Sequence, residues 1–358
     1  MNKLQNFQAI EFELPANLEA GEPPEARGLA RDDVRLMVSY QNSDAILHTT
    51  FRYLDHYLEA GDVLIVNTSG TLNAALPALA PNGDQLELHL STQLPAGLWS
   101  VELRQFTEAG TKPFYSAQAG EQYQLPNGGI LTLLTPYNNG QRFGDNKVRL
   151  WVATVHLPLP LLDYLNQEGV PIRYGYVQDA WPSDYYQTVY ATEMGSAEMP
   201  SAGRAFTAEL ITKLAARGVQ IAPLILHTGV ASLEDHEPPY EEYFDVPLET
   251  AELLNAARDR GARLIAVGTT VVRALETVVD KNGRFHPGTG WTDIIITPHT
   301  KVRSVDGMLT GMHEPNATHL AMLEAVSNRA HLQKTYQQAL DLNYLWHEFG
   351  DLHLILPA

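Results

Sequence analysis

Apolar runs of strand length recur along the chain and alternate with segments of helical spacing. The runs lie at 35–39, 63–66, 221–226, 264–267, 293–296 and 352–356. A strand that is apolar at nearly every position is typical of a sheet covered on both faces. Helical spacing predicts short helices around Leu54 and from Leu161 to a stop at Gly169, and further helices at 208–217, 247–260, 317–325 and 332–342. This alternation indicates a mixed α/β fold.

The segment 71–154 has a different pattern. Leu86, Leu88 and Leu90 alternate with polar residues, and clusters of Pro, Asn and Gly recur at strand-length spacing. Short strands without helices between them predict a small β-barrel or sandwich. A chain of 358 residues exceeds the usual size of one compact core. We therefore predict an α/β main domain formed by 1–70 and 155–358, with a β-barrel domain inserted at 71–154.

The segment 263–276, RLIAVGTTVVRALE, combines a buried strand, a Gly-Thr-Thr turn and the start of a helix. We expect the hydroxyls of Thr269 and Thr270 to lie at the N-cap of that helix. A helix start directs backbone N–H groups and a positive dipole end to one spot. Arg273 and Glu276 lie three residues apart on one helix face, so they can pair with each other or flank a ligand. An ordinary α/β crossover has the same local pattern.

Composition narrows the possible functions. The absence of cysteine excludes disulfides, thiolate metal sites and cysteine nucleophiles. No apolar run has membrane-spanning length and the N-terminus lacks a signal pattern, so we expect a cytoplasmic protein. The formal charge of −18 disfavours broad nonspecific binding of nucleic acid. A local basic patch is compatible with that charge, and Arg27, Arg31 and Arg35 recur every four residues.

Generic catalytic motifs are mostly missing. The sequence has no GxxxxGK[ST] phosphate loop, no GxSxG elbow and no GxGxxG after a strand, and 288–290 is interpreted as a turn. His313 and Glu314 match the first two residues of the HExxH zinc motif, but Ala317 occupies the place of the second histidine. The run 235–237, Asp-His-Glu, is able to bind metal but is expected to be a solvated loop. We expect no metal site.

Polar residues follow several of the predicted strands and precede helices. His227 ends the strand at 221–226, as Gly268 ends the strand at 264–267. Ligands of open α/β sheets bind beyond the carboxyl ends of strands, so these two turns are expected to border one pocket. Ser201, Gly203 and Thr207 lead into a third helix start.

The order of these motifs resembles the S-adenosylmethionine:tRNA ribosyltransferase-isomerases of queuosine biosynthesis. The resemblance covers almost the whole chain. It is carried by FELP at 12–15, Arg31-Asp32 with Arg35, GDVL at 61–64 with Asn67, YQTVYA at 186–191, IAVGTT at 265–270 with Arg273 and Glu276, TDI at 292–294, and Gly350-Asp351. The two six-residue segments in this order are the most specific part of the match.

The resemblance implies a two-domain α/β protein with an inserted β-barrel, acting as a monomer. It implies that S-adenosylmethionine serves as a ribosyl donor and that no metal is used. The ribosyl group goes to 7-aminomethyl-7-deazaguanine at the wobble position of tRNA and is rearranged to epoxyqueuosine, with release of adenine and methionine. Such chemistry needs a base near the carbon that bears the sulfonium, and donors that stabilise developing charge.

The sequence departs from the family pattern in several site segments. Ala205 replaces the family's histidine in the segment 201–207, and the segment 67–75 lacks both arginines of the family. The segment 239–242 loses its histidine and keeps Glu242, and Gly311 replaces an asparagine. His227, Gly229, Arg273 and His313 are retained.

The resemblance, carried onto matching positions, gives His227 as the preferred general base, with Glu242 and His313 as alternatives. It assigns substrate contacts to Arg31, Asp32, Ser201, Gly203, Phe206, Thr207, Gly229, Gly268, Thr269, Thr270 and Arg273. The departures leave two other hypotheses open. One is a diverged paralogue that binds S-adenosylmethionine or a nucleoside and uses a different acceptor. The other is a non-catalytic binding protein on the same scaffold.

Overall fold

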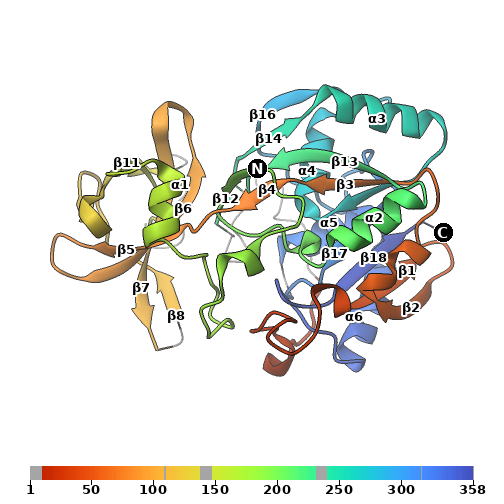
Figure 1. The fold of residues 1–358 in the computed structure, drawn as a ribbon, viewed down its shortest axis with the longest axis horizontal. Coiled ribbons are helices and arrows are strands. Elements are labelled where there is room, and N and C mark those ends of the chain that lie inside the picture. Colours follow the sequence, from red (N-terminus) through yellow and green to blue (C-terminus); the bar gives the residue numbers. More distant parts are fainter. Residues whose placement is uncertain (1–9, 109, 138–146, 231–239, 316, 358) are drawn as a thin grey trace.

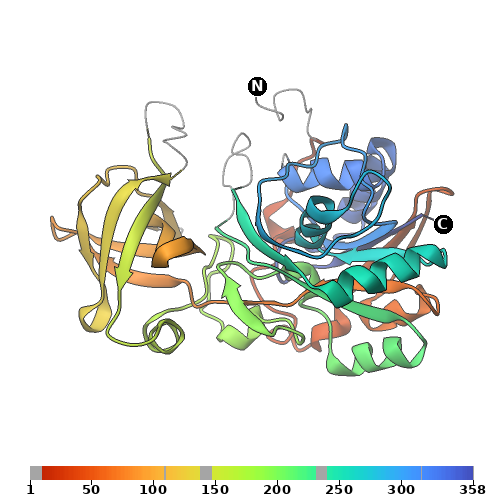
Figure 2. The ribbon, with the colours of Figure 1, turned by 90° about the horizontal axis from the view of Figure 1, so that it is seen from above.

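A computed structural model describes residues 10–108, 110–137, 147–230, 240–315 and 317–357. A β-barrel lobe lies beside a larger α/β body, and only a few chain segments join the two (Figure 1). The view from above shows the same separation into two lobes (Figure 2). The mixed α/β fold with an inserted barrel is therefore confirmed.

In the part of the chain that is described, nine strands form the sheet of the α/β body. In spatial order they are β16 (Gly288–Thr292), β14 (Glu242–Val246), β13 (Gln220–Leu226), β3 (Val63–Asn67), β15 (Leu264–Val267), β17 (Gly307–Gly311), β18 (Leu352–Leu356), β1 (Arg35–Tyr40) and β2 (Ala45–Thr50). Strands β13, β3, β15 and β17 run parallel to one another in the middle of the sheet. Their carboxyl ends therefore lie along one edge.

The two faces of this sheet have separate hydrophobic cores. Alternate residues of β3 divide between them: Val63 and Ile65 pack in one core, and Leu64 and Val66 in the other. The first core also holds apolar residues of α3 (Leu248–Asp259), α4 (Thr269–Val278), α5 (Thr318–Val326) and α6 (Arg329–Asp341), and the second holds residues of α2 (Ala208–Ala216). This arrangement explains why the central strands are apolar at nearly every position. Among the described helices, none is long and apolar enough to cross a bilayer.

The β-barrel lobe contains β5 (Ala75–Leu79), β6 (Gln85–Gln93), β7 (Leu98–Thr107), β8 (Gly110–Pro113), β9 (Gln122–Gln124), β10 (Ile130–Pro136) and β11 (Leu150–His156). Pairing of β11 with β7 closes the barrel, and β8 extends from β7. Its core includes Leu86, Leu88 and Leu90, the alternating residues noted in the sequence. The same core contains Tyr164 and Leu165 of α1 (Leu161–Glu168), which follows the barrel in the chain.

Several local predictions were wrong. The segment 293–296 forms no strand, whereas 288–290, interpreted as a turn, begins β16 and pairs with β14. The helix expected around Leu54 is a 3₁₀ segment, Phe51–His56. The metal-capable run at 235–237 lies outside the described residues.

The chain passes from the α/β body to the barrel immediately after Asn67. Here β4 (Ser69–Thr71) pairs in parallel with β12 (Glu193–Ser196). The buried amide of Asn67 donates to the Leu226 carbonyl at 2.8 Å and accepts from the Leu226 N–H at 3.0 Å. The side chain thereby continues the pairing of β3 with β13 beyond the last backbone pair.

We predict that Asn67→Ala lowers the free energy of unfolding by about 2–5 kcal/mol, because it leaves the buried N–H and carbonyl of Leu226 without their partner. Urea denaturation measures the change. The exposed Asn42 provides a matched control, and Asn42→Ala is expected to change stability by less than about 0.5 kcal/mol. Equal stabilities of the two variants would contradict the structural role of Asn67.

Candidate functional site

A cavity of about 300 Å³ lies at the carboxyl ends of the parallel strands. We call it the strand-end cavity. Residues that follow β13, β15 and β17 contribute to its wall, as the sequence predicts for an α/β sheet. The lining includes Glu198, Ser201, Thr228, Gly268, Thr269, Thr270, Gly311, His313, Glu314, His319, His347 and Glu348.

The Gly-Thr-Thr turn supplies one wall of this cavity. Gly268 has a φ of 92° and donates its N–H to the Leu309 carbonyl at 2.8 Å, so it turns the chain sharply from β15 into α4. The predicted threonine cap is wrong, because Gly268 is the N-cap and no side chain caps the helix. Thr269 and Thr270 are the first helical residues and line the cavity. The positive end of the helix dipole therefore faces it.

Arg273 and Glu242 form a buried ion pair beside the cavity. The guanidinium of Arg273 also donates hydrogen bonds to the carbonyls of Tyr240 at 3.1 Å and Thr292 at 3.4 Å. Glu242 accepts the Gly229 N–H at 3.1 Å, and burial raises its pKa against the effect of Arg273. These groups fasten the segment after β13 to β14 and α4. Neither side chain belongs to the lining of the strand-end cavity.

Glu276 does not pair with Arg273. Its carboxylate accepts the N–H groups of Arg303 at 2.6 Å and Ser304 at 2.7 Å. It therefore anchors the segment that precedes β17.

His313 lines the same cavity as the Gly-Thr-Thr turn and stacks on His319, with ring centroids 4.7 Å apart and planes at 4°. Its Nε2 atom is 2.8 Å from the Thr310 hydroxyl. Burial lowers the pKa of His313 well below its usual value, and His319 and His347 lower it further. Burial also lowers the pKa of His319 to about 4. Both imidazoles are therefore neutral near pH 7.

His227 lies at the end of β13 but faces a different cavity, between the barrel and the α/β body. Its Nδ1 atom is 2.7 Å from the Ser69 hydroxyl, which is in turn 2.6 Å from that of Ser196. Gly195 packs directly against the imidazole ring, and a side chain at this position would overlap the ring. Burial lowers the pKa of His227, and Glu193 opposes this effect. The next residue, Thr228, lines the strand-end cavity.

The remaining predicted site residues divide between the cavity and the fold. Ser201 lines the strand-end cavity. Gly203 packs against the Tyr190 hydroxyl, and Phe206 packs edge-on against Phe51. Thr207 caps α2 by accepting the Leu210 N–H at 3.1 Å, which confirms the helix start expected there.

Arg31 and Asp32 lie away from both cavities. Arg31 donates to the carbonyls of Gln187 at 2.9 Å and Asp184 at 3.0 Å, and Asp32 contacts Arg52. Arg27 and Arg35 likewise bond internal groups, the Phe349 carbonyl and the Asp351 carboxylate. The series of arginines noted in the sequence therefore holds segments of the fold together.

Sequence reasoning missed a group of acidic and aromatic residues in the strand-end cavity. His347, with a φ of 72°, stacks on Tyr176 at 3.9 Å between ring centroids. The Tyr176 hydroxyl donates to Glu348 at 2.7 Å, and burial raises the pKa of Glu348 to about 6. Glu198 and Glu314 lie on the same lining. The local signal was the position of His347 and Glu348, which only Phe349 separates from the Gly350-Asp351 pair.

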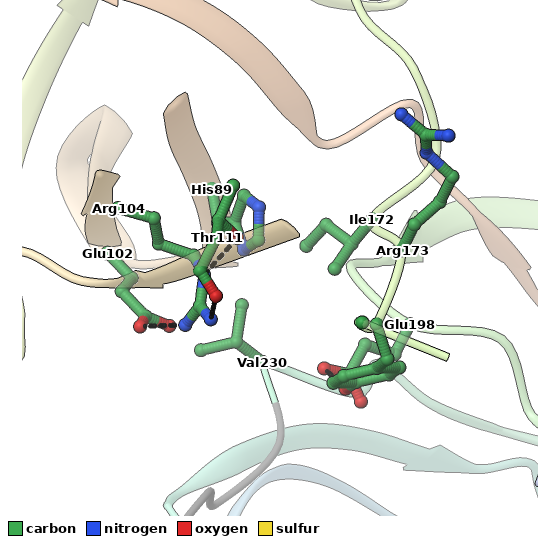
Figure 3. A pocket seen from close by; sticks show the side chains of 10 residues that line it. His89, Glu102, Arg104, Thr111, Ile172, Arg173, Glu198 and Val230 are labelled. Carbon is green, nitrogen blue, oxygen red and sulfur yellow. Dashed lines mark hydrogen bonds and ion pairs between the residues drawn. The ribbon is translucent and has the colours of Figure 1, made fainter. Parts of the chain in front are cut away.

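A third cavity, of about 150 Å³, lies between the barrel and the segment that returns from it (Figure 3). Glu102 is buried there between Arg104 and Arg149. Arg104 also donates to the side chain and the carbonyl of Thr111, each at 2.8 Å. Each nitrogen of the Arg104 guanidinium thus has a partner within the barrel. Among the described residues, no cluster of three or more His, Asp or Glu side chains is arranged to hold a metal ion.

Comparison with known proteins agrees with this architecture. The sequence model of the queuosine biosynthesis protein family matches residues 7–355 of this chain. An S-adenosylmethionine:tRNA ribosyltransferase-isomerase of Symbiobacterium thermophilum is 37% identical over 356 residues, which span 97% of this chain and 98% of that protein. One of Staphylococcus epidermidis is 32% identical over 362 residues, spanning 98% of this chain and 100% of that protein.

The crystal structure of an S-adenosylmethionine tRNA ribosyltransferase from Thermotoga maritima superposes with a TM-score of 0.52 and 28% identity. The superposition covers 96% of this chain and 99% of that one. The similarity thus extends over both the barrel and the α/β body. The chain belongs to the queuosine biosynthesis protein family.

Proposed function

We propose that this protein transfers the ribosyl group of S-adenosylmethionine to 7-aminomethyl-7-deazaguanine at the wobble position of tRNA and isomerises it to epoxyqueuosine. Adenine and methionine are the released products. Full-length similarity to proteins named for this activity supports the proposal. We further propose that it acts in the cytoplasm as a monomer.

The observation that carries the proposal is the chemistry of the strand-end cavity. The start of α4 at Thr269 offers a positive dipole end to the carboxylate of S-adenosylmethionine. Glu198, Glu314 and Glu348 place negative charge in the same cavity, which suits the sulfonium and ammonium groups of this substrate. A volume of about 300 Å³ lies at the lower end of the range for small-molecule sites.

Two neutral histidines are available for proton transfer. His313 lies in the strand-end cavity, where it can approach the acidic protons on the carbon that bears the sulfonium. His227 lies beside the adjoining cavity, and we propose that it accepts the proton of the attacking amine. Because Glu242 is paired with Arg273, we assign the two residues to positioning the segment that carries His227 and Thr228.

One competing function is a paralogue that uses a different acceptor. The specific observation that favours it is the −18 charge, together with the internal bonds of Arg27, Arg31 and Arg35. A gel shift with tRNA at low salt tests it, since the tRNA-dependent function requires a complex there. Adenine release without any change in tRNA mass would favour the other acceptor.

The direct test is mass spectrometry after the protein is mixed with S-adenosylmethionine and tRNA that carries the precursor base. We expect adenine, methionine and a modified nucleoside in equal amounts. We expect His227→Ala to reduce the rate of nucleoside formation by about 100-fold or more, the usual contribution of a general base. The control His56→Ala removes an exposed imidazole, 59% exposed, and is expected to keep the wild-type rate.

Two results would count against these assignments. Binding of S-adenosylmethionine without release of adenine would leave the protein as a non-catalytic binder. A wild-type rate in His227→Ala would exclude this residue as the base.

The pH dependence gives a second prediction. A general base must be unprotonated, and burial places the pKa of His227 below its usual value of 6.5. As pH falls, kcat/KM should therefore reach half of its plateau only below pH 6.5. Initial rates at substrate concentrations below KM, between pH 5 and 8, about the range over which histidine titrates, measure this. An acidic midpoint above 6.5 would contradict the assignment.

A further inference from the structure

The cavity beside His227 has an aromatic wall assembled from both lobes. It has a volume of about 350 Å³ and lies between the barrel turn after β6 and the two outermost strands on one side of the sheet, β14 and β16. Trp99 comes from the barrel, and Tyr243, Trp291 and His227 come from the α/β body. We call it the aromatic cavity.

The rings of this cavity are held in fixed relative positions. His227 and Tyr243 are nearly parallel, with planes at 20° and centroids 5.8 Å apart. Trp291 meets Tyr243 edge-on at 5.9 Å, and the Tyr243 hydroxyl lies 2.7 Å from that of Thr289. Trp291 is nevertheless 37% exposed. A large indole held in place and open to solvent offers a face on which a flat ligand can stack.

The chemistry of the wall suits an unpaired nucleobase. Proteins bind single bases by stacking them on aromatic side chains and by hydrogen bonds to the base edges. Thr92, Gln93 and His227 provide polar groups on the same lining. The net charge of −18 weakens attraction to phosphates, so base contacts must supply more of the affinity for an RNA.

The position of the aromatic cavity fits the acceptor base in particular. His227 lines the aromatic cavity and the next residue, Thr228, lines the strand-end cavity. Consecutive Cα atoms are about 3.8 Å apart, so the two cavities approach each other at this point. A base in one and a ribosyl donor in the other would meet beside His227.

We propose that the aromatic cavity binds the acceptor base of the RNA substrate, with its ring stacked on Trp291 and Tyr243. The inference rests on the proposed function for the identity of the base, 7-aminomethyl-7-deazaguanine. The stacked ring leaves its aminomethyl group directed to the boundary between the cavities. There the amine nitrogen forms a bond to the ribosyl carbon while the bond from that carbon to adenine breaks. His227 accepts the proton that the amine loses.

The test compares two anticodon stem-loop RNAs that differ only at the wobble position. One carries the aminomethyl-deazaguanine and the other an abasic ribose, and binding is measured by fluorescence anisotropy at fixed salt. Trp291→Ala should weaken binding of the base-bearing loop by about 10-fold and leave the abasic loop unchanged. Trp291→Phe keeps a ring and should retain most of the preference. Tyr53→Ala removes an aromatic residue, 47% exposed, that lines none of the three cavities described above, and should behave as wild type.

Three results would overturn the inference. The first is an equal loss of binding by Trp291→Ala for both loops, and the second is no loss for either loop. The third is a loss of S-adenosylmethionine affinity in Trp291→Ala, which would indicate that adenine occupies the cavity. Product formation by the wild-type protein is measured separately. Modified tRNA together with an unchanged base preference in Trp291→Ala would reject the aromatic site and keep the proposed function. If the base preference depends on Trp291 but the wild-type protein forms no product, the aromatic site is kept and the proposed function is rejected.

Discussion

The hydrogen bonds of Asn67 set the geometry on which both cavities depend. This side chain, only 1% exposed, holds the Leu226 backbone at the end of β13 and accepts the Ser69 N–H at 3.1 Å. It also lies 3.4 Å from the Thr270 hydroxyl at the start of α4. One buried amide thus connects the last residue of β3, the strand that leads to His227 and the helix that borders the strand-end cavity. A buried amide with all these partners has a single orientation, which is why a small polar side chain can organise three elements.

The two main cavities arise because the barrel is inserted at the edge where the parallel strands end. Strand ends alone would give an open groove, as in many α/β sheets. The barrel adds Trp99 and the turn after β6 to one side, while the segment that returns from it adds Tyr174, Tyr176 and Glu198 to the other. Burial then keeps the histidines neutral and raises the pKa of Glu348, so that bases and acids persist in one enclosed region.

The sequence predicted those features that depend on local pattern. Continuous apolar runs identified the central strands because each is covered on both faces, and Thr207 marked the start of α2 through its own hydrogen bond. Pairing between distant segments was not predictable. The Gly-rich 288–290 has the composition of a turn, yet pairing with β14 makes it a strand and brings Trp291 beside Tyr243. The expected pocket between the turns at 227 and 268 exists, but Thr228 rather than His227 faces it. The identities of the substrates came from the family resemblance, since no local motif specifies them.

The two chain crossings between the lobes lie side by side, and this has a mechanical consequence. Ala75, at the entrance to the barrel, and Val170, beyond its exit, exchange two backbone hydrogen bonds of 2.9 Å. Together with the pairing of β4 and β12, this bridge ties the entering and returning segments at two places. Any displacement of the barrel at these crossings would move Trp99 relative to Trp291 and, in the same motion, Arg104 relative to Arg173 across the third cavity. The widths of the aromatic cavity and the third cavity are therefore geometrically linked.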